Sequence, residues 1–217
     1  MKKILLSVAV ATSLVFASCG EKKEEKGKKE GDKQKTEANK IEEAKVPEVV
    51  KINGDYAIDT EDSKLTWRGD KSAKLDFHYG TLPMNFGNIK VVDDKIVGGE
   101  FEFNIAGAFA EDIPEKSAKL IEHLLNDHFF NTEKQGNPKF VVTGYENDSI
   151  KGNLVIREIS QSIGFPAKVT VEENLVKAVA DSVHIPMFGF GMEYYEKGFK
   201  PTVIVGINLT ASRVLAE

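Results

Sequence analysis

Histidine and cysteine are the side chains of this sequence best suited to metal binding or catalysis, and the chain holds four histidines and one cysteine. His123 and His128 are five positions apart, so on a continuous helix their side chains would point about 140° away from each other. A helical zinc site instead needs the i, i+4 spacing that places two imidazoles on one face. His78 and His184 fall on separate strand-like segments. The spacing therefore predicts no metal site, with the histidines either hydrogen-bonded or facing solvent.

Other catalytic patterns are also missing from the sequence. No Gly-x-Ser-x-Gly segment occurs, as a nucleophile on a sharp strand-to-helix turn would require. Gly98-Gly99 and Gly189-Phe190-Gly191 lack the strand-loop-helix setting of a phosphate-binding loop, and glycines within strands favour bulges or tight corners. Acidic residues alternate with apolar ones, as on a solvated face, rather than forming a carboxylate pair. We therefore predict that the protein is not an enzyme and has no catalytic residues and no cofactor.

The single cysteine ends an N-terminal segment with the features of an export signal. A positively charged start precedes an apolar run at residues 4–16 that is too short to span a bilayer, so residues 1–18 are predicted to be a cleaved signal peptide. The run VFASC at residues 15–19 resembles a bacterial lipobox, although Phe16 stands where that motif usually has Leu. The resemblance implies lipid attachment at Cys19. The alternative is a chance cysteine at the end of an ordinary signal peptide.

Residues 19–54 are predicted to be the lipidated cysteine and a charged, disordered tether. Residues 21–45 are almost entirely Lys, Glu, Gly, Gln, Asn and Thr, which bury too little apolar area to offset the entropy lost on ordering. The charged run at residues 22–25 resembles sorting signals for the outer surface, so both a periplasm-facing and a cell-surface position in the cell envelope stay open. After Lys45 the chain carries 18 basic and 26 acidic residues, a net charge of −8 that argues against nucleic acid as a partner.

Alternation of apolar and polar residues with period two dominates the folded part, residues 55–217. At least eight segments show it, and it is typical of strands with one buried face. In one of them, Phe77 and Tyr79 are predicted to share the apolar face, with His78 on the opposite side. Asp93-Asp94 and Asn147-Asp148 are turn signals between strands. The pattern favours a sandwich or a closed antiparallel up-and-down barrel, since closure removes exposed strand edges.

One segment breaks this alternation. From Pro114 to Leu125 the leucines and Ile121 follow helical spacing, with charged residues on the other face. Asp112, followed three residues later by Glu115, predicts a variant of the capping box at the start of this helix. The sequence therefore predicts an all-β domain with one short inserted α-helix. Phe129 and Phe130, just after that helix, are expected to close one mouth of the barrel.

Several ordered stretches resemble the YceI-like family. Residues 56–59, 63–67, 78–82, 86–89 and 98–101 resemble its opening hairpins, and 152–157 matches a later strand. The most recognisable motif is His123-Leu124-Leu125, Asp127, Phe129-Phe130 and Asn137-Pro138-Lys139-Phe140. The resemblance runs from about Tyr56 to Arg213. It implies a lipocalin-like barrel, exported in many members, whose lumen in some binds isoprenoid chains or other amphiphiles. The chain departs from the family pattern at Asn104, at Ala108-Phe109 and around residues 186–188.

We therefore predict a lipid-anchored cell-envelope protein that holds a hydrophobic or amphiphilic, isoprenoid-like small molecule in its barrel. A barrel of about eight strands is wide enough to hold one small ligand when its side chains do not fill it. The candidate lumen residues are bulky apolar side chains, each of which could instead pack a filled core: Leu65, Trp67, Phe77, Phe101, Phe103, Phe129, Phe130, Phe140, Phe165 and Val205.

Two other functions stay open. A structural or interaction module would have a filled barrel and an exposed apolar patch around Phe188, Phe190, Tyr194 and Tyr195. An enzyme acting on a lipid-like substrate would need polar groups such as His78 converging inside the barrel, with His128, His184 and Tyr194 as further candidates. The sequence leaves both a monomer and a homodimer open.

Overall fold

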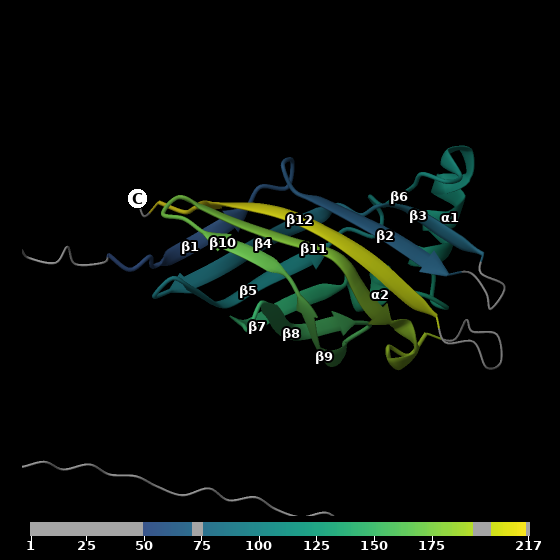
Figure 1. The fold of residues 1–217 in the computed structure, drawn as a ribbon. Helices are drawn as coiled ribbons and strands as arrows, with labels where there is room; N and C mark the ends of the chain where they lie inside the picture. The colour runs from purple at the N-terminus through teal and green to yellow at the C-terminus, as the bar shows by residue number, and fades with distance from the viewer. Residues whose placement is uncertain (1–49, 71–75, 193–200, 216–217) are drawn as a thin grey trace, which may run out of the picture. The chain divides into compact units, whose positions relative to one another are not determined.

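The computed structural model describes residues 50–70, 76–192 and 201–215, all within the unit Glu48–Glu217. The predicted signal peptide, Cys19 and nearly all of the predicted tether lie outside the described residues. Twelve strands run through the described part (Figure 1). They are β1 (Gly54–Ile58), β2 (Lys64–Asp70), β3 (Phe77–Thr81), β4 (Met84–Val92), β5 (Lys95–Phe103), β6 (Phe109–Ala110), β7 (Lys139–Glu146), β8 (Ser149–Ile156), β9 (Ile159–Pro166), β10 (Lys168–Val171), β11 (Leu175–Pro186) and β12 (Thr202–Arg213).

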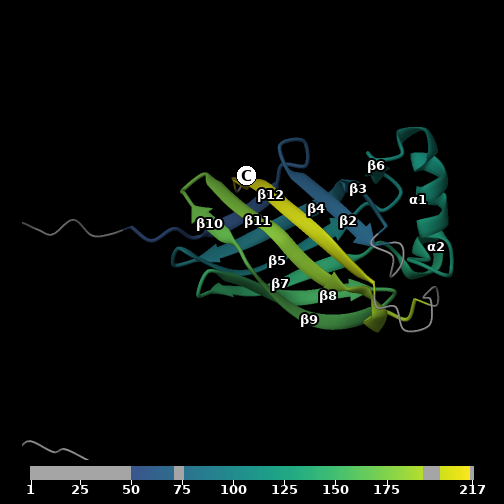
Figure 2. The same ribbon diagram turned by 45° about the vertical axis from the view of Figure 1, so that its right-hand side comes forward.

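The strands form one antiparallel sheet that curls on itself (Figures 1 and 2). Its hydrogen-bonded order is β6-β3-β2-β12-β1-β4-β5-β7-β8-β9, and β10 pairs with β11, which pairs with β12. The long β12 pairs with β11 along one edge and with both β2 and β1 along the other. The prediction of an antiparallel all-β domain is therefore confirmed.

The wall is not one closed ladder of hydrogen bonds. The order ends at β9, and β10, which begins after Ala167, pairs with β11 instead. The strands also outnumber the eight or so that the sequence predicts. One of them, β6, has only two residues, too few for alternation to reveal it.

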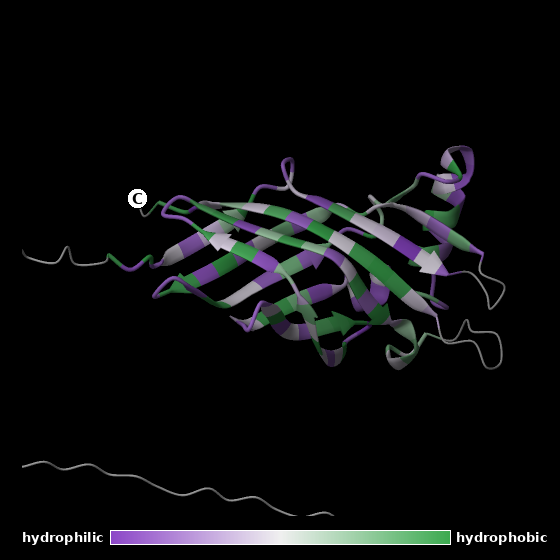
Figure 3. Ribbon diagram, viewed as in Figure 1, coloured by the Kyte–Doolittle hydropathy of each residue, from purple (hydrophilic) through white to green (hydrophobic). Residues whose placement is uncertain are grey.

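The alternation of the sequence becomes the two faces of this wall (Figure 3). Strands β4 and β8 bury every second residue over most of their length. Two hairpins turn at Asp93-Asp94 and Asn147-Asp148, with all four residues at positive φ, as predicted turn positions should be. A third such turn lies at Arg157-Glu158, with φ of 52° and 61°. The sequence did not indicate it because Arg and Glu seldom adopt this conformation.

The inserted helical segment begins as a 3-10 turn, η1 (Pro114–Lys116), and continues as α1 (Ser117–Leu125). A second helix, α2 (Thr132–Gln135), follows and was not predicted because four residues show no periodicity. The predicted capping box is wrong. The Asp112 carboxylate does not cap η1, since it accepts a hydrogen bond from the Tyr79 N–H at 3.1 Å and pairs with His78 at 2.7 Å.

The predicted face of β3 is also wrong. Phe77 and Tyr79 are 38% and 43% exposed, whereas Gly80 is buried. Gly80 lies so close to β6 that an added Cβ would overlap the Phe109 carbonyl oxygen. The Arg68 guanidinium lies 4.1 Å from the centre of the Phe77 ring on the outer face. Alternation showed two faces on β3, but neighbouring elements decided which one faces inward.

Candidate functional site

The inner face of the sheet encloses an apolar cavity of about 50 Å³. Thirteen residues from β2, β4, β5, β7, β8, β9, β11 and β12 line it, and every one of them is apolar. A cavity without polar groups offers no partner for a charged substrate and no acid or base. What this site can do chemically is to remove an apolar group from water.

Tyr56 of β1 belongs to the barrel core, and its side chain is fully buried. Its hydroxyl donates to the carbonyl oxygens of Glu172 and Glu173, at 3.0 and 2.9 Å. These two residues begin the turn between β10 and β11, so the phenol links β1 to that turn. A buried phenol needs such partners, and these bonds hold the two segments together.

One end of the barrel carries the helices (Figures 1 and 2). Phe129 and Phe130, between α1 and α2, are half-buried and pack against the barrel core. The Arg157 guanidinium donates to the Phe129 carbonyl at 3.2 Å, and the Phe130 N–H donates to the Leu124 carbonyl. This end is therefore held by hydrogen bonds as well as by apolar packing.

Half of the ten candidate lumen residues line the cavity, namely Leu65, Phe101, Phe103, Phe140 and Phe165. Val205 belongs to the surrounding core, and Trp67 is half-buried with its indole N–H donating to the Thr81 carbonyl at 3.0 Å. Phe129 and Phe130 pack on the core without lining the cavity. Phe77 lies on the outer face, so its placement in the lumen is corrected by its exposure and by its contact with Arg68.

Eight residues that line the cavity were not among the candidate lumen residues, most of which are aromatic. They are Met84, Ile89, Ile96, Val142, Ile150, Ala178, Ile207 and Leu209. The same period-two signal could have found several of them. Val142 shares the parity of Phe140, and Ile207 and Leu209 share that of Val205.

His78 lies in a pair rather than in a metal cluster. Its Nδ1 is 2.7 Å from an Asp112 carboxylate oxygen, and both side chains are mostly covered. Burial pushes the pKa of Asp112 up, but the hydrogen bonds from His78 and from the Tyr79 N–H, with the His78 charge, lower it overall. The pair connects β3 to the segment that leads into η1, and so holds the helices against the barrel.

The other histidines lie apart from the lumen. His123 packs edge-on against Phe129 and is 3.1 Å from the Asn126 side chain. His128 is exposed beside Asp127, and His184 is exposed on β11. In the described ranges, no group of three His, Cys, Asp or Glu residues is arranged to hold a metal ion. Tyr194, the remaining candidate for a polar site, lies outside the described residues.

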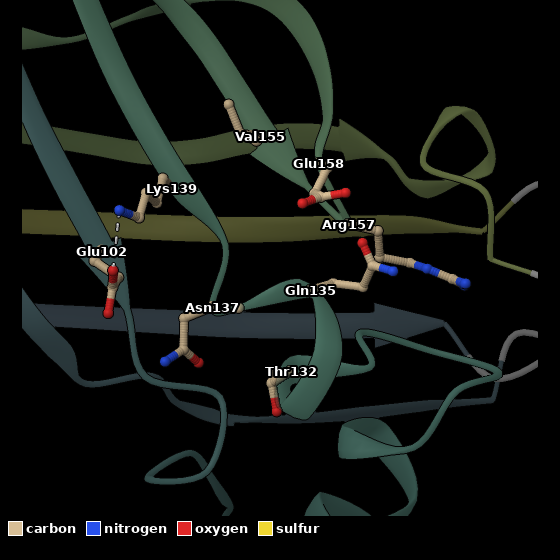
Figure 4. Close-up of a pocket in the computed structure, with 9 residues that line it drawn as sticks. Glu102, Thr132, Gln135, Asn137, Lys139, Val155, Arg157 and Glu158 are labelled. Carbon is tan, nitrogen blue, oxygen red and sulfur yellow. Dashed lines mark ion pairs between the residues drawn. The ribbon is translucent and has the colours of Figure 1, made fainter.

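A second, larger hollow of about 450 Å³ lies on the outer face, between α2 and the turn after β8 (Figure 4). Lys139 of β7 lies 3.3 Å from Glu102 and 3.4 Å from Glu100, both on β5. The hydrogen bond from Asn85 is the main cause that lowers the pKa of Glu102, and the hydrogen bond with Glu102 raises the pKa of Lys139. Lys139 and Glu102 thus pair with each other in this hollow, while Arg157 and Glu158 line it as well.

The comparisons with known proteins agree with this geometry. The family model for the YceI-like domain matches residues 56–211. The chain belongs to the YceI-like family. This YceI-like barrel is similar to the crystal structure of BcnA from Burkholderia cenocepacia, with a TM-score of 0.54 and 12% identity over 70% of this chain and 98% of that one. At that identity, the likeness supports the barrel fold alone.

A mutant CJ YceI protein with a monobromobimane guest is a second similar structure. Its TM-score is 0.44, at 18% identity over 59% of this chain and 85% of that one. Among curated proteins, none matches the chain. The family of this YceI-like chain is thus established by the sequence match over residues 56–211.

Proposed function

We propose that this YceI-like protein binds one hydrophobic or amphiphilic molecule with an isoprenoid-like chain inside its barrel, without catalysis. The observation that carries the proposal is the lumen cavity, whose lining side chains are all apolar and come from eight strands. Such a site recognises a ligand by its apolar surface and by its length. Because of the family resemblance of the sequence, isoprenoid chains are the first class of ligand to test.

Binding requires the side chains of the lumen to move. The cavity of about 50 Å³ is well below the roughly 300–1,000 Å³ of typical small-molecule sites. Burial of apolar surface supplies the driving force for such movement. At about 25 cal/mol per Å², a chain that loses roughly 300 Å² of apolar surface gains about 7.5 kcal/mol before ordering costs. Micromolar binding corresponds to about 8 kcal/mol, so a chain ligand must bury more apolar surface than this to reach that affinity.

Membrane attachment completes the proposal. The lipobox-like segment at residues 15–19 supports lipidation of Cys19, which would keep the barrel at the cell envelope, facing the periplasm or the cell surface. Within the described ranges, none of the helices has the length and apolarity needed to cross a membrane. A tether of about 35 residues would then leave the barrel free to meet membrane-borne amphiphiles.

Organic extraction of the protein purified from its native host tests the proposal. We expect mass spectrometry of the extract to show a lipid-like molecule at about one per chain, and denatured protein treated in the same way serves as the blank. Protein that carries no such molecule and takes up no isoprenoid alcohol in solution would contradict ligand binding.

The small volume of the cavity favours one rival, a filled barrel that acts as a structural or interaction module. The exposed patch predicted for such a module forms only in part, because Phe188 is 51% exposed but Phe190 is fully buried. Tyr194 and Tyr195, also named for that patch, lie outside the described residues. The uptake of an isoprenoid alcohol by the purified protein separates the two functions.

A further inference from the structure

The barrel wall has a seam between β9 and β11. Strand β10 pairs with β11 only from Val176 to Val179, and the register of β11 against β12 shifts just beyond, between Ala180 and Val183. Among the described residues, no strand pairs with β9 on the edge away from β8, or with residues 180–186 of β11 on the edge away from β12. Along this stretch the wall is closed by side chains instead of a hydrogen-bonded ladder.

Residues 187–192, which follow β11, lie against this seam. They start with the 3-10 turn η2 (Met187–Gly189), and Met187, Phe190 and Met192 are all buried in the barrel core. These residues pack directly on β9. An added Cβ on Gly189 would meet the Gln161 amide, and Gly191, at a φ of 64°, lies against Ile159. We call Met187, Phe190 and Met192 the seam plug.

The lumen cavity lies next to the seam. Phe165 lines it from β9, and Ile207 of β12, the partner of Ala180 where the seam begins on β11, lines it too. The seam plug does not line the cavity, but it belongs to the same buried cluster as the lining residues. Movement of the seam plug would therefore open space beside the existing cavity.

Side-chain hydrogen bonds hold two other parts of the barrel. The Tyr56 hydroxyl bonds tie β1 to the turn between β10 and β11, and the Arg157 bond to Phe129 holds the helical end. Separating such groups leaves polar atoms unpaired. The seam plug buries three apolar side chains, and its backbone is tied by the Met187 N–H donating to the Pro201 carbonyl and the Phe190 N–H donating to the Met187 carbonyl. Methionine is unbranched and changes shape easily, so two of the three plug residues suit repacking around a chain.

We propose that the seam plug sets the length of chain that the barrel accepts, and that part of the ligand lies between β9 and β11 in space the plug now fills. This inference rests on the proposed binding function and adds the residues that determine its specificity. A chain longer than the lumen displaces Met187 and Met192, whereas a shorter chain leaves them in place. The preference in binding free energy for short chains therefore depends on the volume of the plug side chains.

The test uses the full chain and two isoprenoid alcohols that differ by one isoprene unit, farnesol and geranylgeraniol. Each alcohol displaces a fluorescent polyene fatty acid, cis-parinaric acid, and the ratio of the two dissociation constants is the readout. In the double variant Met187→Ala with Met192→Ala, we expect this ratio to shift about tenfold toward geranylgeraniol. The matched control is Ile121→Ala on α1, which removes a buried aliphatic side chain outside the barrel core and should leave the ratio unchanged.

A ratio that stays at the wild-type value in the double variant, with both alcohols still bound, overturns this inference alone. Failure of wild-type protein to bind either alcohol instead overturns the binding function on which it rests. Should the double alanine variant not fold, Met187→Leu with Met192→Leu keeps the volume of the plug but reduces its adaptability. Slower association of geranylgeraniol in that variant supports the proposal, and unchanged association rates overturn it.

Discussion

Two phenylalanines show that residue type alone does not decide a role in this barrel. Phe140 and Phe77 were both candidates for the lumen, yet Phe140 lines the cavity and Phe77 is exposed beside Arg68. The difference arises from the strands that carry them. Phe140 lies on β7, inside the sheet order, whereas Phe77 lies on β3, next to the end of that order.

The same substitution at both positions measures this difference. Phe140→Ala removes a buried ring and leaves a cavity, so we expect a loss of about 3–5 kcal/mol of unfolding free energy. Phe77→Ala loses mainly a surface contact with an arginine, worth about 1 kcal/mol or less. Urea unfolding of the two variants checks the prediction. Equal losses would show that Phe77 is buried in solution.

Asp112 makes stability depend on pH at the acid end. Because its pKa in the folded state lies below the ordinary value of 3.8, the carboxylate is stabilised by folding. That contribution is fully present above pH 3.8 and is lost as the pH falls through the lowered pKa. Asp112→Asn should therefore be less stable than wild type at neutral pH, with the gap closing as the pH falls below that value. Thermal melts of both proteins from neutral pH to pH 2 check this, and a gap that is independent of pH would contradict it.

At the scale of elements, contacts with neighbours decide how the helical segment sits on the barrel. The Ser117 hydroxyl at the start of α1 accepts a hydrogen bond from the Ala110 N–H of β6 at 2.8 Å. Strand β6 in turn pairs with β3 directly over Gly80. Because Gly80 has no side chain, β6 can approach this closely, and α1 follows it.

Gly80→Ala should weaken the packing of β6 and α1 on β3. Its Cβ would meet a backbone oxygen, which cannot rotate away, so β6 and α1 must shift at a cost of about 1–3 kcal/mol. Gly144→Ala on β7 is the matched control, because nothing lies within 4 Å of its added Cβ. That control should be neutral or stabilising by up to about 1 kcal/mol. Hydrogen exchange of α1 amides should rise in the first variant alone, and equal protection in both would count against the prediction.

Elements with long patterns were predicted from the sequence, whereas short ones were not. The alternating strands and the helix near residues 114–125 have enough repeats to be recognised. The helix α2, the turn η2 and strand β6 have two to four residues each, and the Arg157-Glu158 turn lacks the usual residue types. The eight lining residues that were not selected have no aromatic ring to mark them in the sequence. Whether each one lines the cavity depends on which strands meet around it.

At the scale of the whole molecule, the proposed membrane attachment depends on Cys19. Cys19→Ser removes the thiol to which a lipid would be joined. We expect this variant to move from the membrane fraction to the soluble fraction of its native host, because a tether rich in charged residues has little affinity for lipid. Ala44→Ser, a small change within the tether, is the control and should stay with the membrane. Retention of the Cys19 variant by membranes would contradict lipid anchoring.

By itself, the sequence determined an all-β domain with a helical insertion, because period-two and helical patterns are local and repeat many times. Motifs spread over most of the folded part also indicated the family, and the family resemblance implied the barrel. Only the tertiary structure decided that Phe77 faces outward, that Asp112 binds β3 rather than capping a helix, and that β9 and β11 meet across a seam. These features depend on which distant segments lie side by side, and a local pattern carries no information about its neighbours in space.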